Sequence, residues 1–284
     1  MSCVEPVVLK EGAFPCGKCL PCLFRLRRQW RSRLLLEATC HARTSFVTLT
    51  YDNAYYPEFG DLCPDHLQRW LKRIRKFEVK RSGGKLRYFA VGEYGDRLGR
   101  PHYHVALFGL GCEQGGGIRG CACSSCEGVR KTWGLGHVLI GSWGPQSASY
   151  VCGYVSRKAT SDYWGDRVPP FRRMSLVPGL GAVAVRKHAL DVLQLRLGEL
   201  RGVPTHLLLD GKSLLLGRQL RLEYSRVTGE KLTKVQFGEK LSVVRAFAWE
   251  NGRSVASVFR ELGESYASVL AQKEELVKSR KAGL

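Results

Sequence analysis

The sequence predicts an α+β fold, an antiparallel sheet with helices packed on one of its faces, and three observations support this. Segments rich in β-branched and aromatic residues, typical of strands, alternate with segments whose apolar residues recur at helical spacing. These segments follow the order strand, helix, strand, strand, strand, helix. The 284 residues, of which 44% are hydrophobic, are enough for one compact domain with a core and a smaller second region.

The individual elements follow from local signals. Apolar residues spaced between arginines indicate an amphipathic helix, β-branched runs indicate strands, and a proline opens each of the two later helices because it suits a first helical turn. In chain order we expect a helix over 20–41, a strand over 45–51, a helix over 64–80, strands over 85–93, 101–109 and 136–143, and a helix over 145–159. A linker of hairpin length joins the strands over 85–93 and 101–109, so these two strands should pair.

Composition divides the chain into three regions. Residues 1–44 form a cysteine-containing lead-in and a basic helix, and residues 45–162 form the sheet core with a Gly- and Cys-rich loop over 109–128. Residues 163–284 begin with a proline-containing linker and continue as a basic, mainly helical C-terminal region. A short hairpin is expected around the turn at Asp210 and Gly211.

The charge favours a polyanionic partner. Lysines and arginines number 45 against 25 aspartates and glutamates, a formal net charge of +20. The sequence shows neither a secretory signal nor an apolar run long enough to cross a bilayer, so we expect an intracellular protein with no membrane partner. In a reducing compartment the 11 cysteines should be thiols or metal ligands, and not disulfides.

Two histidines and a glutamate are candidate ligands for a divalent metal ion. His102 and His104 are two positions apart in an expected strand, so both side chains lie on the same face of the sheet. Glu93 ends the preceding strand, where hairpin geometry places it opposite the histidine strand. Two imidazoles and one carboxylate, with positions open to phosphate oxygens, suit Mg²⁺ or Mn²⁺ better than a closed zinc site.

Two tyrosines and a lysine form a stripe on the last helix of the core. Tyr150, Tyr154 and Lys158 are spaced four residues apart, and Arg157 flanks the stripe. The stripe ends in a cation, which is unusual for a buried aromatic face. A metal ion and an ammonium group beside a phenol would favour the phenolate and stabilise charge on a phosphate, a combination that indicates phosphoryl transfer with a tyrosine nucleophile.

These motifs together resemble a known family. The strand from Phe46 to Thr50, the His102-Tyr103-His104 motif and the tyrosine helix stand in the order of the HUH endonuclease superfamily in its replication-initiator arrangement. More closely, Pro15-Cys16-Gly17-Lys18-Cys19 with Cys22, and Pro178-Gly179-Leu180-Gly181, are similar to the replication initiation proteins of gokushoviruses, small single-stranded DNA phages of the Microviridae. The resemblance covers residues 15–182.

The resemblance implies a fold, an activity and partners. The fold would be the HUH or RRM-like palm, and the activity would be metal-dependent nicking of a viral origin, with a 5′-phosphotyrosine intermediate and later rejoining of unit-length circles. Glu93, His102 and His104 would hold the metal ion, Tyr150 and Tyr154 would attack in turn, and Lys158 would assist by binding phosphate. Thr48, Thr50 and Arg157 would contact DNA. The partners would be viral single-stranded and replicative-form DNA in the cytoplasm of a bacterial host.

A host helicase and polymerase are also implied. Asp210-Gly211-Lys212-Ser213 ends like a phosphate-binding loop, but His206 occupies the position of the required glycine, so no ATPase is expected.

The cysteines leave two alternatives open. Cys112, Cys121, Cys123 and Cys126 lie in one loop, and Cys16, Cys19 and Cys22 precede the first helix. Either group could hold a structural Zn²⁺ ion, the loop group with a complete set of four thiolates, or both could be reduced thiols. An iron–sulfur cluster in the earlier group is disfavoured because Leu26 stands where a fourth cysteine would follow.

Two other functions compete with nicking. One is a non-catalytic, zinc-braced nucleic-acid-binding protein whose basic helices contact the DNA backbone. The other is a relaxase or transposase with the same histidine motif. The tyrosines follow the histidines, which opposes a relaxase, and they are paired, which opposes a single-tyrosine transposase.

Overall fold

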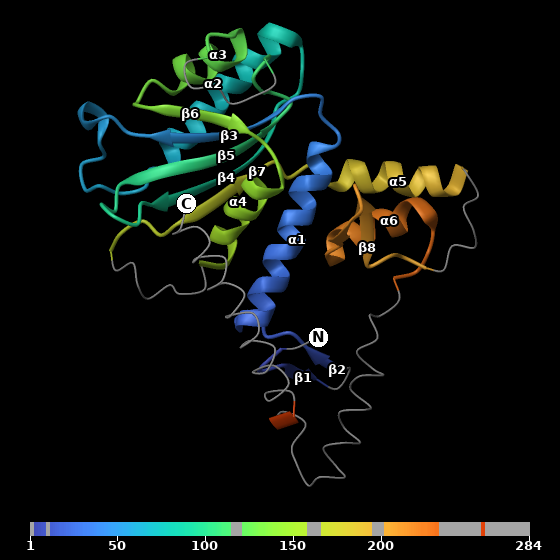
Figure 1. Cartoon of the computed structure of the whole chain (residues 1–284). Helices are drawn as coiled ribbons and strands as arrows, with labels where there is room; N and C mark the ends of the chain where they lie inside the picture. Colours follow the sequence, from blue (N-terminus) through green and yellow to red (C-terminus); the bar gives the residue numbers. More distant parts are fainter. Residues whose placement is uncertain are drawn as a thin grey trace. The chain divides into compact units, whose positions relative to one another are not determined.

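The computed structural model describes residues 3–9, 12–114, 121–157, 166–194, 202–232 and 257–258 (Figure 1). The chain divides into two compact units, the smaller made of Met1–Arg28 with Lys231–Leu284 and the larger of Gln29–Glu230. The larger unit contains the central sheet. In the described part of the chain, no helix is both long and apolar enough to cross a membrane.

The larger unit is built on a five-stranded sheet with the order β6-β3-β5-β4-β7, in which every neighbouring pair is antiparallel. The strands are β3 (Thr44–Thr50), β4 (Arg87–Tyr94), β5 (Pro101–Phe108), β6 (Val138–Ser142) and β7 (Phe171–Met174). The helices of this unit are α2 (Pro64–Ser82), α3 (Ser124–Trp133), α4 (Pro145–Arg157), α5 (Ala182–Gln194) and α6 (Arg218–Thr228), and α1 (Leu20–Ala38) enters it at Gln29. The α+β class, the antiparallel sheet and the six elements expected between 45 and 157 are confirmed.

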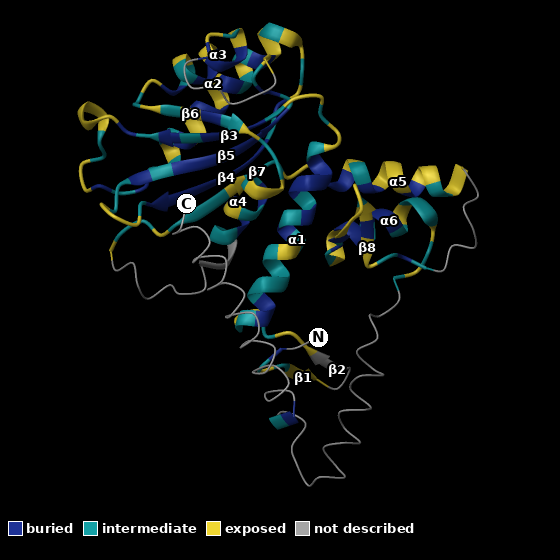
Figure 2. Ribbon diagram, in the orientation of Figure 1, coloured by how far each residue is buried: buried dark blue, intermediate teal, exposed yellow. Residues whose placement is uncertain are grey.

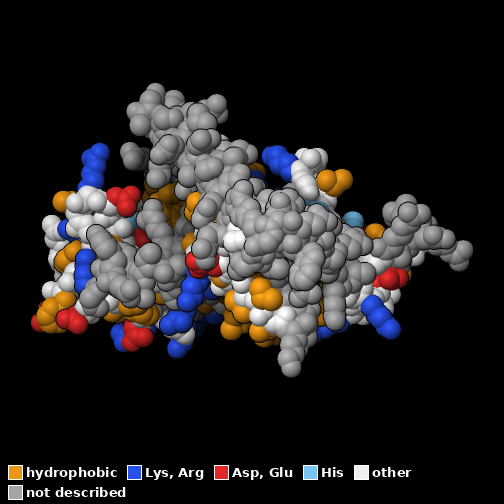
Figure 3. All heavy atoms as spheres, turned by 90° about the horizontal axis from the view of Figure 1, so that it is seen from below, with side chains coloured by type: hydrophobic (Ala, Val, Ile, Leu, Met, Phe, Trp, Pro, Cys, Tyr) orange, Lys and Arg blue, Asp and Glu red, His pale blue; other side chains and the backbone are white. Residues whose placement is uncertain are grey.

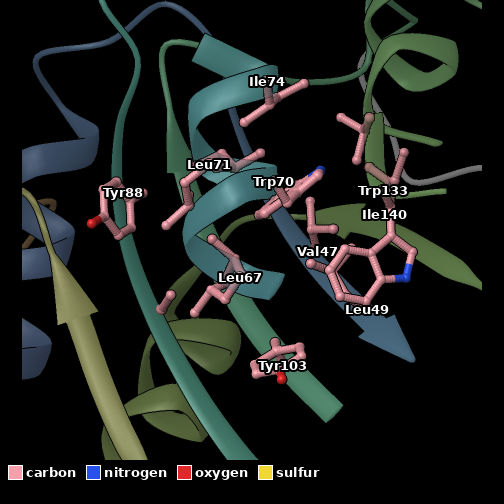
Figure 4. Packing of buried hydrophobic residues seen from close by; sticks show 14 of the residues in the cluster. Val47, Leu49, Leu67, Trp70, Leu71, Ile74, Tyr88, Tyr103, Trp133 and Ile140 are labelled. Carbon is pink, nitrogen blue, oxygen red and sulfur yellow. The ribbon is translucent and has the colours of Figure 1, made fainter. Parts of the chain in front are cut away.

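Helices cover both faces of the sheet, so the expectation of helices on one face is wrong. On one face, Leu67, Trp70 and Ile74 of α2 and Trp133 of α3 pack on the strands, as Figure 4 shows. On the other face, α1 places Trp30 against Phe89 of β4, with ring centroids 5.4 Å apart, and α4 lies over β4 and β5. The reason is that β4 and β5 are buried at nearly every position, and not at alternate ones (Figure 2), so apolar side chains on both faces must be covered.

Several elements were not expected from the sequence. A hairpin of β1 (Val7–Leu9) and β2 (Gly12–Phe14) lies in the lead-in, α3 begins inside the Gly- and Cys-rich loop, and β7 lies in the stretch predicted as a linker. A short 3-10 helix, η1 (Asn53–Tyr55), follows β3. Glycine permits the packing of α3 on α2, because a Cβ at Gly128 would overlap the Phe77 ring.

The expected C-terminal hairpin is present, as β8 (His206–Leu209) and β9 (Lys212–Leu215). Asp210 and Gly211 form its turn with φ of 48° and 71°, the left-handed conformation that a two-residue hairpin turn needs. The helix expected after residue 218 is α6, and the remainder of that expectation, 233–256 and 259–284, lies outside the described residues.

A buried carboxylate anchors the Pro178-Gly179-Leu180-Gly181 motif. Glu37 of α1 is 1% exposed and accepts hydrogen bonds from Arg87 Nε at 2.6 Å and from the backbone N–H of Gly181 at 2.8 Å. Arg87 also donates to the carbonyl oxygens of Val177 and Pro178, at 3.2 and 2.6 Å. Burial raises the pKa of Glu37, but hydrogen bonds from His41 and Gly181 and the charge of Arg87 outweigh it, so the pKa lies below its ordinary value.

We expect Glu37→Gln to lower the free energy of unfolding by about 3 kcal/mol at neutral pH, because it leaves the Arg87 charge buried without its partner. Since the folded pKa is the lower one, wild-type stabilisation by this carboxylate is present above the unfolded pKa and is lost as the pH falls through the folded pKa. The difference between the two proteins should therefore shrink below about pH 4. Urea unfolding at several pH values measures this. Glu127→Gln, which removes an exposed ion pair with Lys131, is the control and should cost less than about 1 kcal/mol; an equal loss in both variants would contradict the anchoring role.

Candidate active site

The β4–β5 hairpin brings the expected metal ligands together. The backbone N–H of Gly95 donates to the carbonyl of Arg100 at 2.9 Å and closes the turn. The resulting register pairs Glu93 with His102, and β3 pairs Thr48 with His104 on the other side of β5. Since paired residues share a face, all four side chains lie on the face that α4 covers.

The glutamate and the two histidines form a compact group. Glu93 Oε1 lies 2.9 Å from His102 Nε2 and 2.7 Å from His104 Nε2. Glu93 is 4% exposed, and its second oxygen, Oε2, is buried without a hydrogen-bond partner in the part of the chain that the structure describes. A buried carboxylate oxygen without a partner is costly unless a cation or water satisfies it. The donor set and this oxygen therefore fit a divalent metal ion.

The outer nitrogens of both imidazoles are already held. His102 Nδ1 lies 3.1 Å from the carbonyl oxygen of Arg100, and because a carbonyl only accepts, Nδ1 is the protonated nitrogen. His104 Nδ1 lies 2.9 Å from Thr48 Oγ1, which can accept from it in the same way. Both rings thus direct Nε2 at Glu93, as partners outside a metal site orient histidine ligands.

Glu93 and His102 also shift each other's titration. Burial raises the pKa of Glu93, but hydrogen bonds from His102 and His104 and their charge bring the pKa below its ordinary value. Burial lowers the pKa of His102, but the hydrogen bond and charge of Glu93 raise it further than burial lowers it. A metal ion would have to displace the His102 proton, so binding should weaken as the pH falls.

The two tyrosines of α4 face this group. Tyr150 OH lies 3.3 Å from His104 Nε2, and the Tyr150 ring meets the His104 ring edge-on at 5.0 Å between centroids. The Tyr154 ring is 6.0 Å from the His104 ring and within 17° of parallel to it. Phe46 of β3 stacks on His104 at 5.5 Å, a contact that sequence reasoning gave only as packing beside the site. Tyr150 is 40% exposed, so its hydroxyl is accessible to a substrate.

The remaining expected site residues stand apart from this cluster or are not described. Thr50 pairs with His102 in register, and its hydroxyl donates to the carbonyl of His137 at 3.3 Å. Arg157 is the last residue of α4, and nothing further is described for its side chain. Lys158 lies outside the described residues. On the described part of the face seen in Figure 3, Lys and Arg side chains stand at several separate places with acidic side chains among them.

The cysteines gather in two groups of four. The loop group is Cys112, Cys121, Cys123 and Cys126, and the N-terminal group is Cys3, Cys16, Cys19 and Cys22; in each, the ligand atoms lie within 4.8 Å of one another. Cys3 is the ligand that sequence reasoning missed, because it is 13 residues from Cys16 and only the unexpected β1–β2 hairpin returns the chain to it.

Backbone N–H groups favour the thiolate form at one cysteine of each group. Burial raises the pKa of Cys123, but hydrogen bonds from the backbone of Glu113 and Cys126 outweigh it and lower the pKa to about 6. In the same way, burial is outweighed at Cys16 by the backbone of Cys19 and Lys18, and the pKa falls to about 7. Thiolates are the form of cysteine that binds metal ions.

Comparison with known proteins agrees with the region of this site. Residues 44–159 match a family model described as replication-associated protein ORF2. The chain is 32% identical over 162 residues to replication-associated protein ORF4 of Chlamydia phage 1, 28% over 181 residues to replication-associated protein ORF2 of Spiroplasma virus 4, and 31% over 164 residues to replication-associated protein VP4 of Bdellovibrio phage phiMH2K.

These alignments cover 53%, 60% and 53% of this chain and 40%, 56% and 50% of the relatives. The matched part of the chain thus spans about half the length of these relatives. No solved structure matches the chain.

Proposed function

Because residues 44–159 match the family of replication-associated proteins, we propose that this chain initiates rolling-circle replication of a small single-stranded DNA phage by cutting the viral origin with a tyrosine. The observation that carries the proposal is the position of the Tyr150 hydroxyl, 3.3 Å from His104 Nε2 and beside the Glu93 carboxylate. A nucleophile and a metal-binding group at this separation can share one phosphate.

Glu93, His102 and His104 would hold Mg²⁺ or Mn²⁺. The mixed nitrogen and oxygen donors suit these ions, and three protein ligands leave positions open. When bound, the ion supplies positive charge to the non-bridging oxygens of the scissile phosphate. Thr48 and the Arg100 carbonyl keep both Nε2 atoms directed at the site, so the ligands are ordered before DNA arrives.

Tyr150 would make the first cut. Its oxygen attacks the phosphorus, the bond between phosphorus and the 3′ oxygen breaks, and the 3′ oxygen leaves as a hydroxyl that a polymerase can extend. The 5′ phosphate remains on the tyrosine as an ester, so the bond energy is kept and strand joining needs no ATP. Tyr154, whose ring lies 5.2 Å from that of Tyr150, would attack the regenerated origin and release a unit-length circle.

DNA would approach across the exposed side of α4. The net charge of +20 favours binding to the phosphate backbone, which contributes affinity more than sequence discrimination. Thr50 and Arg157 remain proposed DNA contacts, and Lys158 a proposed phosphate ligand. Host helicase and polymerase, acting in the cytoplasm of a bacterial cell, complete the proposed setting.

We also propose that the loop group holds a structural Zn²⁺ ion. Cys112 Sγ and Cys121 Sγ are 3.5 Å apart, close to the edge of about 3.8 Å that a tetrahedron with zinc–sulfur bonds of ~2.3 Å requires. Cys123 and Cys126 lie at the start of α3, so the ion would fasten this helix to the end of the loop after β5.

The experiment that tests the function is a cleavage assay. Purified protein is incubated with overlapping single-stranded oligonucleotides that tile the genome encoding it, with Mn²⁺ or with EDTA. We expect cleavage at one site, dependent on Mn²⁺, and binding that weakens steeply with salt because counterions are released. Binding without cleavage of any oligonucleotide would favour the non-catalytic DNA-binding alternative.

A further inference from the structure

The N-terminal group of four cysteines lies apart from the site described above, within the smaller unit. Cys3 precedes the β1–β2 hairpin, Cys16 and Cys19 follow it, and Cys22 lies in the first turn of α1. The sulfur atoms come close in pairs: Cys16 Sγ to Cys22 Sγ at 4.0 Å and Cys19 Sγ to Cys3 Sγ at 3.8 Å.

These separations suit one ion. Four sulfurs at ~2.3 Å from a tetrahedral zinc ion are about 3.8 Å apart. A disulfide would require a sulfur–sulfur distance of ~2.05 Å, and an iron–sulfur cluster holds its cysteines around several metal atoms and so farther apart. All four residues are free cysteines.

The backbone around the group is already arranged for thiolates. The N–H groups of Lys18 and Cys19 donate to Cys16 Sγ at 3.4 and 3.3 Å, and that of Cys16 donates to Cys3 Sγ at 3.3 Å. Hydrogen bonds of this kind favour the charged sulfur that zinc binds.

The hairpin also lacks a hydrophobic core of its own. Val7, Val8, Leu9 and Phe14 are 50%, 47%, 51% and 45% exposed, whereas Cys3 is 1% exposed. A hairpin with strands of three residues is not stable in water without further support. What is buried here is sulfur, so a metal ion is the natural source of the missing stability.

We propose that Cys3, Cys16, Cys19 and Cys22 bind a structural Zn²⁺ ion that fastens the N-terminal hairpin to the start of α1. Cys3 closes the coordination shell, as the fourth thiolate ligand. This ion is separate from the divalent ion proposed at Glu93, and its presence is independent of DNA cleavage.

The test is the zinc content of the full-length protein, measured by native mass spectrometry without DNA. Cys3→Ser should lose one zinc per chain relative to wild type, whereas Cys40→Ser, which removes an exposed cysteine outside both groups, should lose none. Equal zinc content in the two variants would overturn the proposal, as would a disulfide at Cys3 in the wild type.

Limited proteolysis of the wild type gives a second measurement that does not depend on the folding of a variant. Lys18 is exposed, but its backbone N–H is bonded to Cys16 Sγ. Removal of zinc by a chelator should speed trypsin cleavage after Lys18 by about 10-fold or more, because local opening then costs less, and added Zn²⁺ should reverse the change. Cleavage at an unchanged rate would contradict a metal-held segment. Neither result bears on nicking, so this proposal and the proposed function can fail separately.

Discussion

Tyr150→Phe is expected to lower origin cleavage by about 10³-fold or more, and Tyr150→Phe with Tyr154→Phe to abolish it, because phenylalanine keeps the ring but removes the attacking oxygen. Tyr150 is placed first because its hydroxyl lies 3.3 Å from His104 Nε2, whereas the structure gives Tyr154 a ring contact with His104. Tyr154→Phe alone should therefore reduce the first cut less and reduce the release of circles more. Single-turnover cleavage of a labelled oligonucleotide and a strand-joining assay measure the two steps.

Tyr55→Phe is the matched control. It makes the same chemical change at a tyrosine of η1 that is 54% exposed, and it should leave both steps unchanged. Full cleavage by the double variant of α4 would show that neither phenol is the nucleophile, and cleavage by water activated at the metal site would then be the better account.

His102→Ala and His104→Ala are expected to reduce cleavage by at least about 10²-fold while DNA binding stays within a few-fold of wild type, because a two-ligand site holds the ion weakly. Glu93→Gln should behave in the same way, since it keeps the size of the side chain and removes the charge that attracts the ion. Raising the Mn²⁺ concentration should recover part of the Glu93→Gln activity.

His137→Ala is the control for the histidines, because that side chain is 81% exposed and lies outside the metal group. A parallel loss of DNA binding and cleavage in His102→Ala would instead indicate that the histidine maintains the fold. Thr48→Val should give a smaller loss than either histidine variant, since it removes only the hydroxyl beside His104 Nδ1.

The sequence was sufficient for the parts of the site that depend on local periodicity. Two residues apart in a strand means one face, which placed His102 with His104, and four residues apart in a helix placed Tyr150 with Tyr154. The short β4–β5 turn made the pairing of Glu93 with His102 predictable as well.

The parts that depend on contacts distant in sequence were not predictable. Thr48 meets His104 only through the β3–β5 register, which joins residues 56 positions apart. Cys3 joins its group through a hairpin of strands too short to show a period. β7 is a four-residue edge strand whose sequence, Phe-Arg-Arg-Met, lacks the β-branched residues of a typical strand.

The most direct test of the central claim is identification of the covalent intermediate. The protein is incubated with the cleaved oligonucleotide and Mn²⁺, digested with nuclease and trypsin, and analysed by mass spectrometry. The account predicts a nucleotide 5′-phosphate attached to Tyr150 or Tyr154, and its absence in the presence of EDTA. Cleaved DNA with a free 5′ phosphate and no modified tyrosine would contradict it.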